Sequence, residues 1–383
     1  MEFSGYNLKI GIIGGGQLGK MMTQEAKKMG FYVTILDPTP NSPAGQLADE
    51  QLVGGFHDRN KIKELVERCD VTTYDIEDID AVALKELVEA GHLIHPSPQI
   101  LEVIQDKWKQ KEVLARSGIP IARYRKVEEG ALAAAVEEFG FPVVQKACRG
   151  GYDGRGVFVI RTRDDTGRAL KVESFLEEFV DIEKELAVMV ARSAAGEIKC
   201  HPVVEMAFDE AANICDMVVA PAEVAQKIQD ESRQIAVAVV ESLGGAGIFG
   251  IEMFLDKAGN VLVNEIAPRP HNSGHYTIEA CVTSQFEQHI RAIMGLPLGS
   301  TELLTPAVMI NILGGEGYEG RAMFQGIRET LQIPGAALHL YGKRITRPFR
   351  KMGHVTVVDK EVENALEKAQ RIKTLLRVVS EEA

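Results

Sequence analysis

The sequence predicts a protein of mixed α/β and α+β class that is divided into three domains. In about the first 100 residues, short apolar runs alternate with helix-like stretches, which is typical of a small parallel α/β domain. Further along, several apolar runs are joined by turns, which favours an α+β region that is mostly antiparallel. Prolines near 98 and 297 mark joints, so the 383 residues divide into domains at 1–98, 99–297 and 298–383.

The N-terminal domain begins with a βαβ unit. Leu8–Ile13 is an apolar strand that runs into glycines, a helix begins near Leu18, and Phe31–Leu36 is a second strand. Further helices and strands are expected at Lys61–Arg68, Val71–Tyr74, Ala81–Glu89 and Leu93–Ile94.

The middle region opens with a helix from about Pro98 to Arg116 and contains a long helix at Glu223–Ser242. Its expected strands are Phe141–Ala147, Val157–Ile160, Lys184–Ala191, Pro202–Phe208, Ile214–Ala220, Ile248–Leu255 and Asn260–Ile266, the last two as a hairpin. After the second joint, strands are expected at Ala307–Leu313, Leu338–Tyr341 and His354–Val358, with a closing helix at Glu361–Leu376.

The composition excludes several classes of protein. Lys and Arg number 43 against 55 Asp and Glu, and a net charge of −12 argues against nonspecific nucleic-acid binding. No apolar run approaches the roughly 18 residues of a membrane helix, and the N-terminus lacks the basic and apolar parts of a signal peptide. The scattered cysteines favour reduced thiols, so we expect a cytoplasmic protein.

The first glycine loop, Gly14–Gly19, fits the G-x-G-x-x-G pattern between a strand and a helix, and Asp37 ends the next strand. Glycines let the backbone approach a ligand, and the helix N-terminus presents free N–H groups to an anion. These features indicate a phosphate without naming its carrier. A dinucleotide, another phosphate ligand and a tight turn without a ligand all stay open.

The second glycine loop, Arg149–Gly156, is flanked by strands on both sides and therefore predicts a hairpin with a pliable tip. Such a tip can close over phosphates and exclude water, and Lys146 in the preceding strand can reach the same phosphates. Asp153 and Arg155 lie in the tip. The alternative is an ordinary surface hairpin with a solubilising Asp and Arg.

A second hairpin brings carboxylates together. Pairing across the turn that follows Leu255 places Glu252 opposite Asn264 or Glu265, and one residue of register decides which. Two carboxylates among apolar neighbours repel unless a cation lies between them, and oxygen ligands beside phosphates hold Mg²⁺. The alternative is a pair of acids that face solvent.

A polar loop follows directly, with two prolines around Arg269 and then His271 and His275. Loops of this kind at a strand end are common substrate contacts. No third His or Cys is spaced for zinc, and surface histidines are the alternative.

Together these motifs resemble the ATP-grasp superfamily. They are most similar to the N5-carboxyaminoimidazole ribonucleotide synthetase family, the ATPase subunit of phosphoribosylaminoimidazole carboxylase. The resemblance rests on Gly14–Gly19, Thr73–Glu77, Gly151–Gly156, Asn264–His275 and Tyr341–Lys343, the last followed by Arg347 and Pro348. It implies an ATP-grasp fold with a Rossmann-like pre-ATP-grasp domain, a flap subdomain at about 120–183 and a small β-rich C-terminal domain.

The resemblance also implies an ATP site with Mg²⁺. Its phosphate-binding residues would be Lys107, Lys146 and the flap residues Gly151, Tyr152, Asp153, Gly154, Arg155, Gly156 and Val157. The backbone of Glu177, Glu178, Phe179 and Val180 would contact the adenine, and Glu185 the ribose. Glu252 and Glu265 would ligate Mg²⁺ beside Asn264. Phe208 stands where the family often has a histidine, so stacking would replace a hydrogen bond there.

The implied reaction carboxylates the exocyclic amine of 5-aminoimidazole ribonucleotide with ATP and bicarbonate. The substrate phosphate would contact Gln17, Leu18, Lys343 and Arg350, and its other end Glu77, Tyr152 and His275. Asp153, Arg155, His275 and Lys146 would be the catalytic residues. The family implies a homodimer. The alternatives are another ATP-grasp ligase such as a formate-using glycinamide ribonucleotide transformylase, an NAD-dependent oxidoreductase, and a noncatalytic nucleotide sensor.

Overall fold

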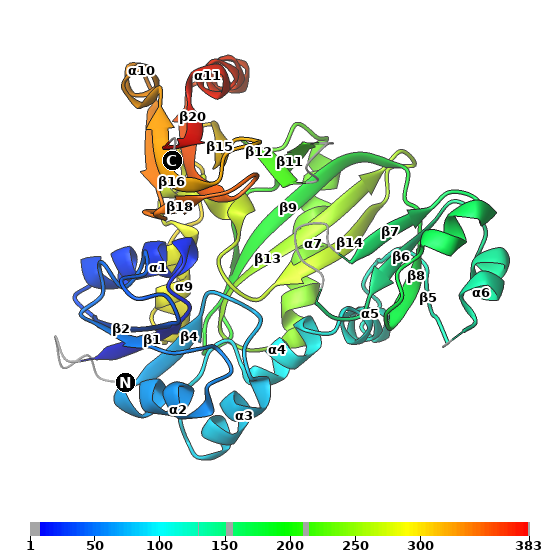
Figure 1. The fold of residues 1–383 in the computed structure, drawn as a ribbon, viewed down its shortest axis with the longest axis horizontal. Helices are drawn as coiled ribbons and strands as arrows, with labels where there is room; N and C mark the ends of the chain where they lie inside the picture. Colours follow the sequence, from blue (N-terminus) through cyan, green and yellow to red (C-terminus); the bar gives the residue numbers. More distant parts are fainter. Residues whose placement is uncertain (1–7, 129, 151–155, 210–213, 382–383) are drawn as a thin grey trace.

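The computed structural model describes residues 8–128, 130–150, 156–209 and 214–381. Figure 1 shows the N-terminal and C-terminal parts of the chain next to each other on one side of a long central sheet. The strands β5 to β8 lie at the far end of the molecule. Segments far apart in sequence are therefore brought to one side of the central sheet.

The N-terminal sheet is parallel, with strand order β3-β2-β1-β4. Its elements are β1 (Lys9–Ile13), α1 (Gln17–Lys28), β2 (Tyr32–Asp37), β3 (Glu50–Val53), α2 (Arg59–Arg68), β4 (Val71–Tyr74) and α3 (Ala81–Glu89). The expected βαβ unit is confirmed. The expected strand at Leu93–Ile94 is reduced to a single bridge between Ile94 and Thr72.

The prediction of one helix from Pro98 to Arg116 is wrong in one respect. The segment forms two helices, α4 (Pro98–Ile104) and α5 (Lys107–Arg116). Asp106 has extended backbone angles, and its side chain accepts a hydrogen bond from the Lys109 amide at 3.2 Å. It therefore caps a new helix. The break makes Lys107 the first residue of α5.

The central sheet is antiparallel, with order β14-β13-β9-β11-β12-β15-β19-β17 and β10 beside β9. Its strands are β9 (Ile182–Arg192), β10 (Ile198–Cys200), β11 (Val204–Asp209), β12 (Ile214–Ala220), β13 (Gly247–Asp256), β14 (Val261–Ala267), β15 (Ala307–Leu313), β17 (Ala336–Leu340) and β19 (Lys351–Val358). Because β15 pairs with β12, the sheet continues from the middle of the chain into its C-terminal part. The helix α7 (Gln226–Leu243) packs its apolar side, including Ile235 and Val239, against this sheet.

A separate antiparallel sheet of order β5-β8-β6-β7 carries the second glycine loop. Its elements are β5 (Tyr124–Lys126), α6 (Leu132–Phe139), β6 (Val143–Ala147), β7 (Val157–Ile160), a 3₁₀ turn (Arg163–Arg168) and β8 (Ser174–Glu178). The strands β6 and β7 pair with each other, as expected for a hairpin.

The remaining elements complete the C-terminal side. They are a 3₁₀ turn (Asn272–Gly274), α8 (Thr277–Ala280), α9 (Gln285–Ile293), β16 (Gly320–Gln325), α10 (Ile327–Leu331), β18 (Ile345–Thr346), α11 (Val362–Leu375) and β20 (Arg377–Ser380). The helix α9 packs against α1, and Phe286 and Ile290 join the apolar core of the N-terminal sheet. No helix in the described part of the chain is long and apolar enough to cross a membrane.

Candidate active site

A β-bulge decides the register of the carboxylate hairpin. Glu252 pairs with Glu265, and the next pair is Met253 with Val263, so Asn264 is the extra residue of β14. A bulge of this kind leaves one residue unpaired and re-aims its side chain. Both Asn264 and Glu265 then reach lysines on other elements. The sequence left this register open, and the structure chooses Glu265 as the partner of Glu252.

Each of the two predicted phosphate-binding lysines contacts one of these hairpin residues. Lys107 Nζ donates to Glu265 Oε1 at 2.8 Å, and Lys146 Nζ donates to Asn264 Oδ1 at 3.1 Å. Lys107 begins α5, whereas Lys146 lies in β6. The structure thus brings both cations to the carboxylate hairpin from different sides.

The carboxylates of this cluster are held at unusual pKa values. Burial, together with the charges of Glu265 and Glu185, raises the pKa of Glu252 to about 8. Burial also raises the pKa of Glu185 to about 7, against the opposing effect of Lys146. A cation placed among these groups would relieve their repulsion.

The donor set fits Mg²⁺ that is shared with phosphates. Glu252 and Glu265 face each other across adjacent strands and supply the oxygen ligands that Mg²⁺ prefers. Within the described residues, no group of three or more His, Cys, Asp or Glu side chains is placed to hold a metal ion. The two carboxylates would therefore need further oxygens from a ligand.

Glu177 lies at the end of β8, where its side chain is buried between two lysines, Lys146 and Lys111. The resemblance implied only a backbone contact here. Glu178 is exposed, and its amide donates to the Arg123 carbonyl at 2.8 Å. The half-buried side chains of Phe179 and Val180 follow the strand.

The second glycine loop lies mostly outside the described residues, which include none of Gly151, Tyr152, Asp153, Gly154 and Arg155. The base of the hairpin is described. The Ala147 amide donates to the Gly156 carbonyl at 2.8 Å, and Lys146 pairs with Val157. The base of the hairpin therefore lies in the strand that carries Lys146.

In the first glycine loop, several backbone amides donate hydrogen bonds to carboxylates of the protein itself. Asp37 accepts a hydrogen bond from Gly15 N at 2.8 Å, and Asp75 accepts from Gly16 N and Gly19 N at 3.1 and 2.9 Å. A Cβ at Gly14 would lie 1.5 Å from Asp75 Oδ1, so only glycine fits there. Because Asp37 is engaged by the loop itself, it is a poor partner for the ribose of a dinucleotide.

The amides of Gln17 and Leu18 have no hydrogen-bond partner within the described residues. They are the first residues of α1, where backbone N–H groups lack partners inside the helix. Both residues are predicted substrate contacts, and free N–H groups at a helix N-terminus are suited to a phosphate.

Glu77 connects the N-terminal domain to the polar loop after β14. Its carboxylate forms an ion pair of 3.0 Å with Arg269. Burial raises the pKa of Glu77, Arg269 opposes this shift, and the charge of Glu265 adds to it. Glu77 therefore lies close enough to the carboxylate hairpin to sense its charge. The Arg269 Nε is buried and has no hydrogen-bond partner among the described residues.

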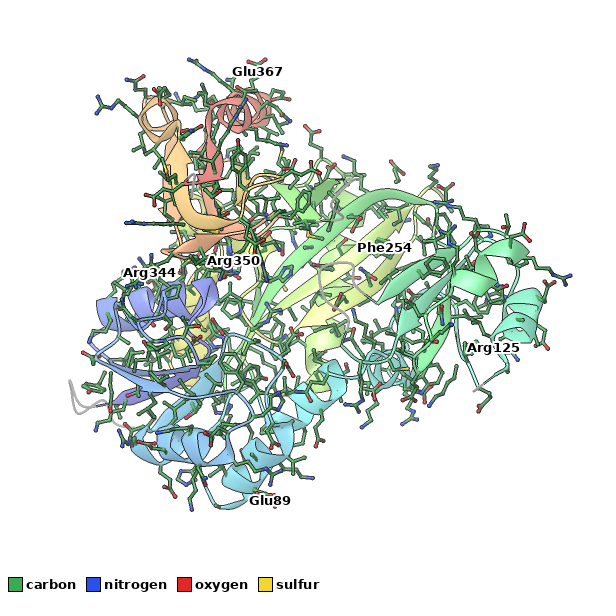
Figure 2. The ribbon with its side chains drawn as sticks, in the orientation of Figure 1. Glu89, Arg125, Phe254, Arg344, Arg350 and Glu367 are labelled. Carbon is green, nitrogen blue, oxygen red and sulfur yellow. The ribbon has the colours of Figure 1, made fainter. Side chains whose placement is uncertain are left out.

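The predicted phosphate ligands of the C-terminal part are only half-buried. Lys343 Nζ donates to the Lys351 carbonyl at 2.7 Å, and Arg350 Nη1 donates to the Ile345 carbonyl at 2.6 Å. Burial, together with the nearby Arg350 and Lys351, lowers the pKa of Lys343 to about 7, although Asp75 opposes this effect. Lys20 of α1 donates to the Leu340 carbonyl at 2.9 Å, so the segment that carries Lys343 lies against the helix that follows the first glycine loop. The side chains in this region are drawn in Figure 2, which labels Arg350.

The two histidines of the polar loop are not on the surface. His271 Nε2 lies 3.2 Å from Glu252 Oε1, and His275 Nδ1 lies 3.0 Å from Gln285 Nε2. Burial lowers the pKa of both, to about 3 for His271 and well below the usual value for His275, so both rings are neutral. The ring of His275 also lies 4.8 Å from that of His354.

Phe208 packs at the edge of a core cluster beside Cys215, its partner across a bulge between β11 and β12. Three residues that the sequence did not single out as ligands have a clear place in the site. Asp75 and Arg269 lie within the motifs quoted above, whereas Lys111 lies outside them. Lys111 follows Lys107 by one helical turn, which is a signal that the sequence contained.

Comparison with known proteins agrees with the architecture along most of the chain. Residues 8–105 match a ribonucleotide synthetase preATP-grasp domain, residues 112–286 an ATP-grasp domain, and residues 307–368 a phosphoribosylaminoimidazole carboxylase C-terminal domain. The predicted ATP-grasp fold, with its preATP-grasp and C-terminal parts, is thereby confirmed.

Individual relatives are similar over nearly their whole length. The N5-carboxyaminoimidazole ribonucleotide synthase of Bacillus subtilis is 43% identical over 91% of this chain and 90% of its own. The crystal structure of the synthetase from Thermotoga maritima matches with a TM-score of 0.91 and 63% identity over 98% of this chain and 100% of that one. The Aspergillus clavatus enzyme in complex with ADP and 5-aminoimidazole ribonucleotide matches with a TM-score of 0.89 and 36% identity over 96% and 98%. The chain belongs to the N5-carboxyaminoimidazole ribonucleotide synthetase family of ATP-grasp enzymes.

Proposed function

We propose that this chain carboxylates the exocyclic amine of 5-aminoimidazole ribonucleotide, using ATP and bicarbonate and releasing ADP and phosphate. The observation that carries the proposal is the convergence of two sets of groups on one place. Lys107, Lys146 and the Glu252–Glu265 pair suit a metal-bound triphosphate. Glu77, joined to Arg269, links this set to the N-terminal loop that suits a ribonucleotide phosphate.

For the first stage, the ATP phosphates replace Glu265 and Asn264 as partners of Lys107 and Lys146. Glu252 and Glu265 would hold Mg²⁺, which neutralises phosphate charge when bound. Glu185 and the segment Glu177–Val180 would contact the nucleoside, with Phe208 as a stacking partner. The second glycine loop would cover the phosphates. In support, Gly156 at its end and Val157 after it pair with Ala147 and Lys146 in the preceding strand.

In the reaction itself, a bicarbonate oxygen attacks the γ-phosphorus, and the bond from that phosphorus to the ADP oxygen breaks. The product is carboxyphosphate. The Arg269 Nε, which has no hydrogen-bond partner among the described residues, is a donor suited to the bicarbonate anion. Because carboxyphosphate is destroyed by water, exclusion of solvent by the covering loop has a chemical purpose.

In the second stage, the amine nitrogen of the ribonucleotide attacks the carboxyl carbon, either of carboxyphosphate or of CO₂ formed from it. Phosphate is the leaving group, and the nitrogen loses a proton. Asp153 is the proposed proton acceptor, and Arg155 and Tyr152 lie close to it in sequence. His275 Nδ1 accepts from the Gln285 amide nitrogen, so its neutral ring carries a hydrogen on Nε2 and would donate a hydrogen bond to the substrate. Gln17, Leu18, Lys343 and Arg350 would hold the substrate phosphate, and Glu77 the aminoimidazole end.

ADP release in the presence of two substrate pairs tests this proposal. Aminoimidazole ribonucleotide with bicarbonate should stimulate release, whereas glycinamide ribonucleotide with formate should not. The reverse result would favour the transformylase. A nicotinamide fluorescence titration addresses the oxidoreductase, for which Asp37 is badly placed. We further propose that the enzyme is a cytoplasmic homodimer, as its family implies.

A further inference from the structure

Helix α5 carries a buried lysine to which the reaction above assigns no role. Lys111 lies one turn after Lys107 on the same side of the helix. Its side chain is only 4% exposed, and that of its partner Glu177 is 3% exposed. Lys111 therefore faces Glu177 and not solvent. Lysines are almost never buried to this extent unless they are paired.

One carboxylate is shared between two lysines. Glu177 forms ion pairs with both Lys111 and Lys146, and Lys111 also donates to the Val263 carbonyl at 3.4 Å. Burial acts to raise the pKa of Glu177, but the two ammonium groups outweigh it and hold the pKa below its usual value. Glu177 is therefore ionised in the folded protein.

Lys111, Glu177 and Lys146 form a triad whose net charge determines how strongly the site attracts an incoming phosphate. Lys146 is the most accessible of the three side chains, with 12% exposed, and it also contacts Asn264 at the carboxylate hairpin. With Lys111 present, its ammonium neutralises Glu177, and the triad keeps a net positive charge. Without Lys111, Lys146 and Glu177 would form a neutral pair, and the attraction for phosphate would fall.

We propose that Lys111 is a positioning residue for ATP binding, which neutralises Glu177 so that the charge of Lys146 stays available to the phosphates. The inference rests on the proposed ATP site. Lys111 would thus increase the affinity for ATP through charge alone, without contacting a substrate. The ribonucleotide site, which lies toward the N-terminal loop, should be unaffected.

The test is a charge cycle measured as ATP affinity by titration calorimetry in the presence of Mg²⁺. Lys111→Met should weaken ATP binding by roughly tenfold or more, since a unit charge close to the phosphates is lost from the balance. Adding Glu177→Gln to Lys111→Met restores the net charge and should return the affinity to within about threefold of wild type. Lys109→Met, on the exposed side of α5, is the matched control and should bind ATP as wild type does.

Thermal unfolding of each variant separates folding from binding. If Lys111→Met does not fold, the double variant is compared directly with wild type, because it removes both members of a buried pair and should fold. An ATP affinity more than about threefold below that of wild type would then overturn the inference. Wild-type ATP affinity in a folded Lys111→Met protein, or a folded double variant that stays as weak as the single one, would overturn the inference. Failure of the wild-type protein to bind ATP at all would instead overturn the proposed function on which the inference rests.

Discussion

The Lys107 ammonium lies 2.8 Å from the Glu265 carboxylate, although the two residues are 158 positions apart in sequence. One is a predicted ligand of the ATP phosphates and the other a predicted ligand of Mg²⁺. Without ligands, each side chain therefore neutralises the other. Binding of ATP alone would leave Glu265 without its cation, and binding of Mg²⁺ alone would leave Lys107 without its anion. We therefore expect the nucleotide and the metal to bind cooperatively.

Lys107→Met should separate these two effects. ATP affinity should fall about tenfold or more, because a charge-assisted contact to phosphate is lost. Mg²⁺ alone, in contrast, should stabilise this variant more than wild type, since Glu265 no longer has a competing ammonium. Thermal unfolding with and without MgCl₂, at constant ionic strength, measures the second effect. Equal stabilisation of both proteins by Mg²⁺ would contradict the exchange of partners.

Lys343 should make ribonucleotide binding depend on pH. Its pKa is lowered to about 7, so the ammonium loses its proton in the neutral range. A phosphate binds the charged form, and KM for the ribonucleotide should therefore rise as the pH increases from 7 to 9, by up to about tenfold per unit. Lys343→Arg keeps its charge throughout this range and should remove the rise. A wild-type KM that stays constant over these pH values would exclude this role.

Glu77→Gln should affect one substrate and spare the other. The variant leaves Arg269 without its ion pair and removes a charge from the predicted aminoimidazole end of the site. KM for the ribonucleotide should rise about tenfold or more, while ATP affinity should change less than about threefold. Steady-state kinetics and ATP titration give the two values. Exposed Glu86→Gln is the control, and a larger loss of ATP affinity than of ribonucleotide affinity would refute the assignment.

Asp75 should make the unfolding free energy depend on pH. Burial raises its pKa to about 6 from 3.8, even though the Gly19 and Gly16 amides favour the ionised form. A carboxyl whose pKa is raised on folding binds its proton more tightly in the folded state. Its contribution to the unfolding free energy is therefore full below pH 4 and is lost as pH rises through about 6.

Asp75→Asn should remove this dependence, which amounts to roughly 1–3 kcal/mol between pH 4 and 7. Urea unfolding of both proteins at pH 4.5, 5.5 and 7 would reveal it as a difference in slope. Parallel curves for variant and wild type would mean that Asp75 does not titrate in this range.

Much of the fold was predictable because its signals are local. Ala81–Glu89 was expected as a helix and forms α3 with the same bounds, since its apolar spacing is regular and Asp80 caps it. The helix expected from Pro98 to Arg116 failed at Asp106. There a capping side chain interrupts a run of good helix formers, and periodicity does not detect such a break.

The candidate site was harder to predict from the sequence, because its side-chain pairings depend on contacts between distant segments. A bulge at Asn264 decided the partner of Glu252, and no pattern in the strand specifies it. Lys111 was not singled out because a lysine is expected to face solvent. Only the packing of β8 against α5 shows that Lys111 is buried in an ion pair with Glu177. The residues Gly151 to Arg155, which include the predicted catalytic Asp153, lie outside the described structure, so their roles stay predictions.

The central claim is that ATP cleavage is coupled to carboxylation of the aminoimidazole ribonucleotide. The most direct measurement supplies MgATP and carbon-13 bicarbonate, with and without the ribonucleotide, and follows ADP and the carbon-13 resonance of the new carbamate together. We expect one labelled carbamate for each ADP, and formation of both should require the ribonucleotide. ADP formed without labelled carbamate, or formed only when formate and glycinamide ribonucleotide are supplied instead, would contradict it.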